Sequence, residues 1–297
     1  MIPEGLKKGD KVALVATAKP VTKKEMKPFL DLMKTWGLEV IEGKFLYDTH
    51  HHFASTDENR AKDFEIAWTD ESIKAVFCAR GGYGSIRMLK HLPKDLFKTK
   101  KWLIGYSDIT TLHLCANRHG LSSIHGPMAL NVFNPNSQTN ANFKQLKTAL
   151  FEGNIEVDCS KSEIINPAAF KGELIGGNLS LLAASMGTAE QPKSKGKVLF
   201  IEEIDEYLYH FDRILQSMDR TGMFKNLAAL IIGGVSKMKD NEVKFGQSAK
   251  EIVTEICAPY GFPIVFDFPA GHAAKNSTIS LGTLCKFDNL FLRQNLK

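Results

Sequence analysis

The sequence predicts an α/β protein with two domains, and three observations support this prediction. The chain has 297 residues, 43% of them hydrophobic, which is enough for two folded domains of ordinary size. In the N-terminal part, apolar strand-like runs alternate with segments of helical periodicity. After Pro127 this alternation weakens, and it resumes further on with new strands and helices. We therefore expect an N-terminal domain at 1–150, a linker at 151–172 and a C-terminal domain at 173–297.

The N-terminal segments follow one another as strand and helix with short connections. Gly37 ends the first expected helix, and a capping box from Ser55 to Glu58 begins the second. The expected strands are 11–16, 38–41, 73–78, 102–104 and 122–125, and the expected helices are 23–36, 57–68 and 108–119. This order predicts a mostly parallel sheet that is covered by helices on both faces.

The C-terminal segments are less regular. The expected helices are 143–150, 178–186, one through 211–215, and 249–258, and the expected strands are 198–201, 229–232 and 264–266. The chain then ends in a hairpin-like segment that contains 278–282. There is no internal repeat and no low-complexity segment.

Composition and charge exclude several classes of protein. The net charge of +5 comes from lysines and arginines interleaved with acids, which does not form a nucleic-acid-binding stripe and favours a small anionic substrate such as a peptide. The five cysteines form no Cys-x-x-Cys pair, as is usual in a reducing compartment. No run of about 18 apolar residues occurs, and Met1 to Lys11 lacks the apolar core of a secretory signal. We expect a cytoplasmic protein that has no membrane partner.

One serine lies where a nucleophile would sit. Ser107 follows the apolar run Trp102 to Ile104 and precedes a helix, so a sharp turn would expose its hydroxyl beside backbone N–H groups. The Gly-x-Ser-x-Gly elbow of α/β-hydrolases has a second glycine where this chain has Ile109. Ser107 is therefore either a nucleophile or a serine that caps its helix.

A glycine-rich segment lies at the same edge of the predicted sheet. Arg80 to Gly84 follows the strand that ends at Cys78, and its three glycines allow close approach of the backbone to a ligand. The segment is typical of an oxyanion hole or a phosphate cradle, or of a tight turn that needs only positive φ. No complete phosphate-loop motif is present, which disfavours the cradle.

A base and a carboxylate complete a possible serine site. His272 lies in a loop of small residues after an apolar strand, and Glu202 follows the buried run Val198 to Ile201 as its first polar residue. Asp205 and Glu206 fit a solvated turn better. The three consecutive histidines His50 to His52 cannot easily converge on one ion, so we expect no metal and no cofactor.

Five motifs together resemble those of the L,D-carboxypeptidase family, the serine peptidases related to muramoyltetrapeptide carboxypeptidase. They are Arg80-Gly-Gly-Tyr-Gly, Gly105-Tyr-Ser-Asp, Gly176-Gly-Asn-Leu, Ile201-Glu-Glu and Gly271-His-x-x-x-Asn276, and they run nearly end to end. The resemblance implies a triad of Ser107, Glu202 and His272, with the N–H groups of Gly82 and Asp108 as oxyanion donors. It also implies a flavodoxin-like N-terminal domain, a C-terminal swivelling β/α domain of barrel-like shape, a cleft between them and a homodimer.

The resemblance implies hydrolysis of the L,D-peptide bond that releases terminal D-alanine from murein tetrapeptide in cell-wall recycling. Relatives that destroy peptidyl-nucleotide antibiotics carry extra C-terminal sequence, for which the interval from Glu202 to His272 leaves little room. This immunity-type activity remains the alternative, and a non-catalytic ligand-binding module is the alternative from another class. The family's usual Pro-Ser after the first strand is replaced here by Thr17-Ala18.

A free C-terminus on the substrate needs a cation or backbone donors in the site. We expect the following residues to contact the substrate: Arg80, Gly81, Tyr106, Asn178 and Arg213. Arg80, Asn178 and Arg213 are the candidates for binding its carboxylate. Arg213 has a second interpretation, as a surface partner of Asp212 or Glu206 on its helix.

Overall fold

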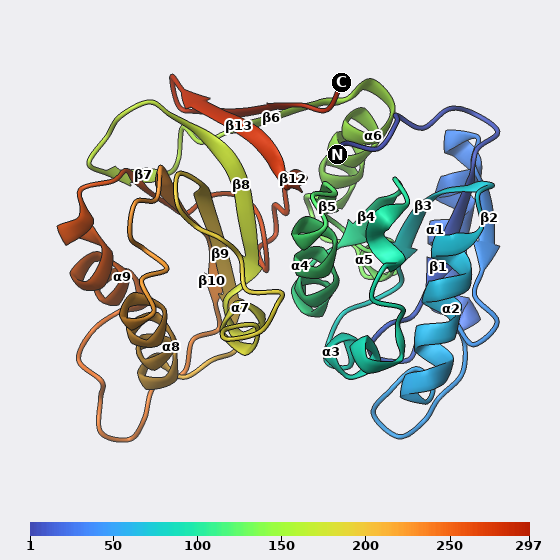
Figure 1. The fold of residues 1–297 in the computed structure, drawn as a ribbon, viewed down its shortest axis with the longest axis horizontal. Helices are drawn as coiled ribbons and strands as arrows, with labels where there is room; N and C mark the ends of the chain where they lie inside the picture. Colours follow the sequence, from blue (N-terminus) through green and yellow to red (C-terminus); the bar gives the residue numbers. More distant parts are fainter.

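The computed structural model describes residues 1–297 and arranges them around two β-sheets that lie side by side (Figure 1). The first sheet has the strand order β12-β5-β4-β3-β1-β2. Its strands are β1 (Lys11–Val15), β2 (Glu39–Glu42), β3 (Ile73–Cys78), β4 (Trp102–Gly105), β5 (Ser123–His125) and β12 (Ile279–Leu281). The first five are parallel and follow the order 2-1-3-4-5 of flavodoxin-like folds, as expected, whereas β12 is antiparallel to β5.

The parallel strands of the first sheet are connected by α1 (Lys23–Trp36), α2 (Asp57–Thr69), α3 (Ser85–Met88) and α4 (Thr110–Arg118), with short 3₁₀ turns at Leu89–His91, Leu96–Lys98 and Ser107–Ile109. After β5, α5 (Leu130–Phe133) and α6 (Thr139–Glu152) lead to the second sheet. Gly37 ends α1 in the left-handed conformation, with φ 77°, as predicted. The predicted cap of α2 is wrong: Thr56, not Ser55, accepts the N–H of Asn59, because the Ser55 hydroxyl points to Asp48.

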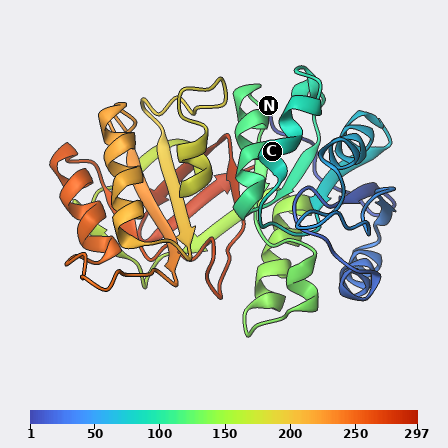
Figure 2. The ribbon, with the colours of Figure 1, turned by 90° about the horizontal axis from the view of Figure 1, so that it is seen from below.

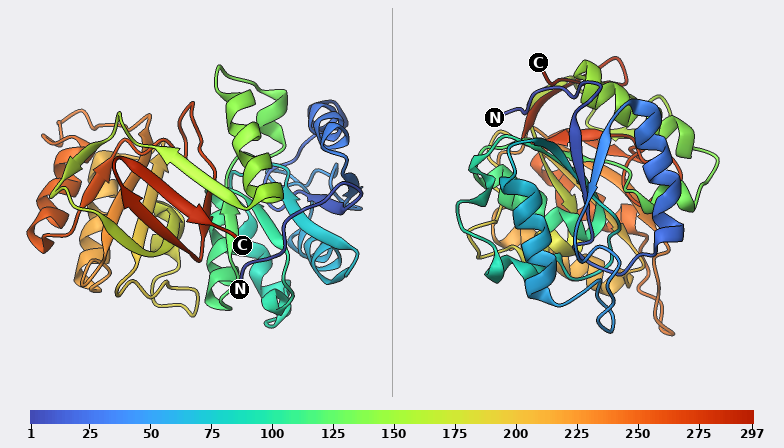
Figure 3. Two further views of the ribbon diagram at one scale, coloured as in Figure 1. Left: turned by 90° about the horizontal axis from the view of Figure 1, so that it is seen from above. Right: turned by 90° about the vertical axis from the view of Figure 1, so that its right-hand side faces the viewer.

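The second sheet is mixed and has the order β6-β14-β13-β8-β9-β10-β11-β7. Its strands are β6 (Asn154–Asp158), β7 (Glu163–Ile165), β8 (Phe170–Asn178), β9 (Val198–Ile204), β10 (Ala229–Ser236), β11 (Ile264–Phe266), β13 (Thr283–Asp288) and β14 (Phe291–Asn295). Its helices are α7 (Leu179–Ala184), α8 (Leu208–Arg220) and α9 (Ala249–Cys257), followed by a 3₁₀ turn at Ala258–Tyr260. Strands β8 to β11 form a parallel centre, and β13 and β14 curl over its end (Figures 1 and 3). No helix in either half has the length and apolar character needed to cross a bilayer.

The chain passes between the two sheets more often than the sequence predicted. The expected linker 151–172 supplies β6 and β7, both of which pair within the second sheet. Ile155 and Val157 are buried there and alternate with exposed polar residues, the pattern of a half-buried antiparallel strand. The expected hairpin at 278–282 instead contributes β12 to the first sheet, and the chain then returns to the second.

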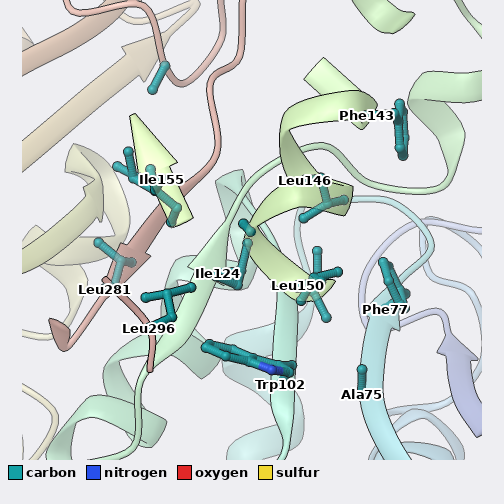
Figure 4. Close-up of a cluster of buried hydrophobic side chains, with 14 of the residues drawn as sticks. Ala75, Phe77, Trp102, Ile124, Phe143, Leu146, Leu150, Ile155, Leu281 and Leu296 are labelled. Atoms are coloured by element: carbon teal, nitrogen blue, oxygen red, sulfur yellow. The ribbon is translucent and has the colours of Figure 1, made fainter. Parts of the chain in front are cut away.

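A shared hydrophobic core joins the two halves, which stand next to each other in the view from below (Figure 2). Leu146 and Leu150 of α6 lie on the side of the helix toward Trp102 of the first sheet, and Phe143 of the same helix belongs to the same cluster further away (Figure 4). Further members of the same cluster, among them Ile155, Leu281 and Leu296, come from β6, β12 and the C-terminal end of the chain. Because buried apolar side chains resist separation, this cluster holds the two sheets in one arrangement.

Candidate active site

The turn after β4 presents Ser107 in a strained backbone conformation. Its φ is 63°, which is unusual for a residue with a side chain, and the residue begins the 3₁₀ turn that leads into α4. Ile109 packs directly over Gly105, since a Cβ built on Gly105 would lie 2.8 Å from Ile109 Cγ1. The glycine required by this turn is therefore at 105, and Ile109 fills the space beside it.

The glycine-rich loop after β3 lies against this serine. A Cβ built on Gly81 would lie 3.2 Å from Ser107 Cβ and 3.4 Å from its Oγ, so a larger residue would press on the hydroxyl. Gly82 has a φ of 121° and is exposed, and its N–H makes no hydrogen bond within the chain. A free N–H on the residue after Gly81 is available as an oxyanion donor.

The carboxylate of Asp108 links the serine turn to the glycine-rich loop. It is 1% exposed and accepts the N–H of Ser85 at 2.8 Å. Burial raises the pKa of Asp108, and the hydrogen bonds from Ser85 oppose that rise. The Ser85 hydroxyl bonds Thr17 Oγ1 at 3.0 Å, and the buried guanidinium of Arg60 donates to the Thr17 carbonyl. This polar network fixes both predicted oxyanion donors, at Gly82 and Asp108, relative to each other.

The predicted base and carboxylate are joined in the second half of the molecule. Glu202 Oε2 lies 2.5 Å from His272 Nδ1 and also accepts the His272 backbone N–H at 3.2 Å. Glu202 is fully buried, and its other oxygen, Oε1, has no partner. Gly271 allows this approach, because a Cβ there would lie 2.7 Å from Glu202 Cβ. A carboxylate on Nδ1 leaves Nε2 of His272 available to accept a proton.

The position of Glu202 in its strand differs from the prediction. Strand β9 continues to Ile204, so Glu202 lies inside the strand and not after its end. The strand can continue because the next residue, Glu203, is also buried and its carboxylate is satisfied by Asn178 Nδ2 at 3.0 Å and by the N–H and hydroxyl of Ser180.

The loop that carries His272 is held by the N-terminal half. Asn276 Oδ1 accepts the Gly271 N–H at 2.9 Å within the loop. Asn142 of α6 donates to the Ala274 carbonyl at 3.2 Å and accepts the Asn276 N–H at 3.2 Å. Asn142 was not predicted as part of the site. Nothing in the sequence around an asparagine in an amphipathic helix indicates that it bonds a loop far away in the chain.

Tyr106, which precedes Ser107 in the chain, packs against His272. Its ring centroid is 5.0 Å from that of His272 and 5.8 Å from that of His125. Ser107 Oγ makes no hydrogen bond to His272 in this structure. Catalytic hydrogen bonds of ligand-free sites are often long and shorten when substrate binds.

Two buried histidines lie behind the serine turn and were not predicted as part of the site. His113 Nε2 lies 3.0 Å from the Gly105 carbonyl, and burial lowers the pKa of His113 to about 4. Burial also lowers the pKa of His125 well below its usual value, and both of its ring nitrogens lack partners. Both rings are therefore neutral near pH 7.

The predicted substrate contacts divide into two groups. Gly81 adjoins Ser107 in space and Tyr106 adjoins it in the chain, whereas Arg80 precedes Gly81 and donates to the Pro20 carbonyl. The Asn178 side chain is occupied, because it donates to Glu203 and caps α7 by accepting the Leu181 N–H. Arg213 is exposed on α8 with its guanidinium 5.1 Å from the Tyr209 ring, and Glu206 pairs instead with His210. These contacts lie within the second half, and the substrate contacts expected of Asn178 and Arg213 stay predictions.

Comparison with known proteins identifies the family. The N-terminal domain model of LD-carboxypeptidases matches residues 12–126, and the C-terminal domain model matches residues 171–287. A Bacillus subtilis protein named "Probable murein peptide carboxypeptidase" is 32% identical, over 94% of this chain and 89% of that protein. The structure of muramoyltetrapeptide carboxypeptidase from Oxalobacter formigenes superposes with a TM-score of 0.85 at 26% identity, covering 96% of this chain and 98% of that one.

A further structural match concerns the fold. The microcin C7 self immunity protein MccF, solved with aspartyl sulfamoyl adenosine, has a TM-score of 0.89 at 19% identity, covering 99% of this chain and 98% of that one. The two domain models together span most of the chain, and the fold agrees over nearly its whole length. The chain belongs to the LD-carboxypeptidase family.

Proposed function

We propose that this protein is a serine L,D-carboxypeptidase that releases the terminal D-alanine from murein tetrapeptide in cell-wall recycling. The observation that carries the proposal is the Glu202–His272 pair, whose imidazole packs against Tyr106, the residue before the strained Ser107. The substrate class is supported by the names of the two carboxypeptidase relatives, which act on murein or muramoyl peptides by those names.

In the proposed mechanism, Ser107 Oγ attacks the carbonyl that precedes the terminal D-residue. His272 Nε2 takes the serine proton and returns it to the leaving amine, while Glu202 holds the ring and stabilises its cation. The N–H groups of Gly82 and Asp108 stabilise the oxyanion, and loss of one such donor costs about 10²-fold to 10³-fold in rate. A water molecule, activated by the same histidine, then hydrolyses the acyl-enzyme.

The proposal places Arg80, Gly81 and Tyr106 along the bound peptide. Gly81 contacts the nucleophile, and the Tyr106 ring contacts the base, so both lie where the scissile bond would be. Arg80 is half-buried at the start of the glycine-rich loop. Asn178 and Arg213 stay candidates for the substrate carboxylate, and Asn178 Nδ2 lies 3.5 Å from the carbonyl of Glu202.

We further propose that the protein is cytoplasmic and forms a homodimer. The five cysteines are all buried and unpaired, which fits a reducing cytoplasm. The family resemblance supports a homodimer, and analytical ultracentrifugation of the purified protein would test that part directly.

The function is tested by incubating purified protein with murein tetrapeptide and measuring D-alanine release by mass spectrometry. We expect release by the wild type, a loss of about 10³-fold or more in Ser107→Ala, and no loss in Ser137→Ala, an exposed loop serine. An aminoacyl sulfamoyl adenylate in a parallel assay tests the immunity-type activity. Cleavage of that compound without release of D-alanine from tetrapeptide would contradict the proposal.

A further inference from the structure

The substrate of a carboxypeptidase carries a carboxylate close to the bond that is cleaved. In a peptide that ends in D-alanine, this group lies three covalent bonds from the scissile carbonyl carbon. A site that selects free C-termini therefore needs a positive group close to its oxyanion donors. The cations next to the glycine-rich loop are the candidates for that role.

The topology of the first sheet brings two loops together at this point. The strand order reverses at β1, which lies between β2 and β3, so the loops that follow β1 and β3 border one crevice. Open α/β sheets bind their ligands at such a switch point. The loop after β1 contains Lys19, and the loop after β3 contains Arg80 and the predicted oxyanion donor Gly82.

The side chain of Lys19 lies directly over Gly82. A Cβ built on Gly82 would lie 2.7 Å from Lys19 Cγ and Cδ and 3.0 Å from its Cε, so the aliphatic stem follows the glycine backbone. Lys19 is half-buried, and its ammonium forms no ion pair or hydrogen bond within the chain. Gly81, the residue before Gly82, contacts Ser107. The stem of Lys19 thus lies over the neighbour of the glycine that adjoins the nucleophile, and its charge is unpaired.

Arg80 forms a hydrogen bond to the turn that contains Lys19. Its Nη1 donates to the carbonyl of Pro20, the residue after Lys19, at 3.2 Å. The same guanidinium forms no ion pair, so neither Lys19 nor Arg80 is neutralised by an acidic side chain. An unpaired cation next to the glycine-rich loop is a suitable partner for an anion, and a peptide carboxylate would supply that anion.

We propose that Lys19 binds the terminal carboxylate of the substrate and that Arg80 holds the Lys19 turn in place. This deepens the proposed function and rests on it. No sequence motif indicated this role, because Lys19 lies in a turn that departs from the family's usual Pro-Ser. Lys19 is then the residue that restricts the enzyme to peptides with a free C-terminus.

The test compares Lys19→Met with wild type on murein tetrapeptide and on the same peptide amidated at its C-terminus. Methionine keeps an unbranched stem over Gly82 and removes the charge. We expect KM for the free acid to rise at least tenfold, with a smaller change in kcat, and turnover of the amide under excess enzyme to be unchanged. Lys24→Met, an exposed position on α1, is the matched control and should behave as wild type on both peptides.

A second measurement separates this role from a structural one. The rate at which a small uncharged fluorophosphonate labels Ser107 should be the same in wild type and Lys19→Met, because that reagent carries no carboxylate. An unchanged KM for the free acid would overturn the inference, as would equal losses on acid and amide together with slower labelling. Failure of the wild type to release D-alanine from tetrapeptide would instead overturn the proposed function.

Discussion

The serine turn and the histidine loop reach their positions by different means. Ser107 is positioned by neighbours that come from one edge of the first sheet, namely Gly81, Gly105 and the Asp108–Ser85 bond. His272 depends on residues that are distant in the chain, with Glu202 on β9 and Asn142 on α6. The nucleophile is thus set by local backbone strain, whereas the base is set by contacts that exist only after both halves have folded.

The two adjacent glutamates of β9, Glu202 and Glu203, also differ in what their carboxylates contact. Both are buried, yet Glu202 contacts the imidazole, whereas Glu203 satisfies Asn178 and Ser180 at the start of α7. The Glu202 carboxylate therefore belongs to the candidate active site, whereas the Glu203 carboxylate stabilises the start of α7. Their neighbouring positions allow the two roles to be separated by matched substitutions.

The largest effect is expected from Glu202→Gln compared with Glu203→Gln. Loss of the carboxylate on Nδ1 should lower kcat by about 10²-fold to 10⁴-fold, because the ring loses its orienting and stabilising partner. Glu203→Gln places an amide N–H against donors and should mainly cost about 1–3 kcal/mol of unfolding free energy. Steady-state kinetics and urea unfolding of both variants check this. A larger kcat loss in Glu203→Gln would reverse the two assignments.

A smaller effect is expected from Asn142→Ala. The substitution removes two hydrogen bonds that hold the His272 loop, so we expect kcat to fall about tenfold with little change in KM. Asn140→Ala, on the exposed face of the same helix, is the control. Wild-type kcat in a folded Asn142→Ala variant would show that the loop keeps its position without α6.

The smallest effect concerns stability and His113. Its pKa is about 4 in the folded protein against 6.5 in the unfolded chain, so the unfolded state binds more protons between these values. Stability should therefore fall as the pH drops through 6.5 towards 4, with His113 alone accounting for about 2 kcal/mol between pH 7.5 and pH 5. Urea unfolding at both pH values, in wild type and in His113→Asn, measures this contribution. An equal decrease in the variant would exclude His113 as its source.

The features that depend on local sequence patterns could be predicted from the sequence. The strand and helix order of the first half follows from apolar periodicity, and the positions of Ser107 and the glycine-rich loop follow from the strand ends that precede them. The crossing of β12 into the first sheet did not follow, because a short apolar strand does not specify which sheet it joins. The contacts of Asn142 and Lys19 were missed for the same reason, since each partner lies far away in the chain.

The central claim is that a serine from one half and a histidine from the other act on the same bond. The most direct test is a phosphonate analogue of murein tetrapeptide, with phosphorus in place of the scissile carbonyl carbon, followed by peptide mapping with mass spectrometry. We expect a covalent adduct on Ser107 in wild type and at least a hundredfold slower adduct formation in His272→Ala. An adduct on another residue, or equally fast modification of Ser107 in that variant, would contradict it.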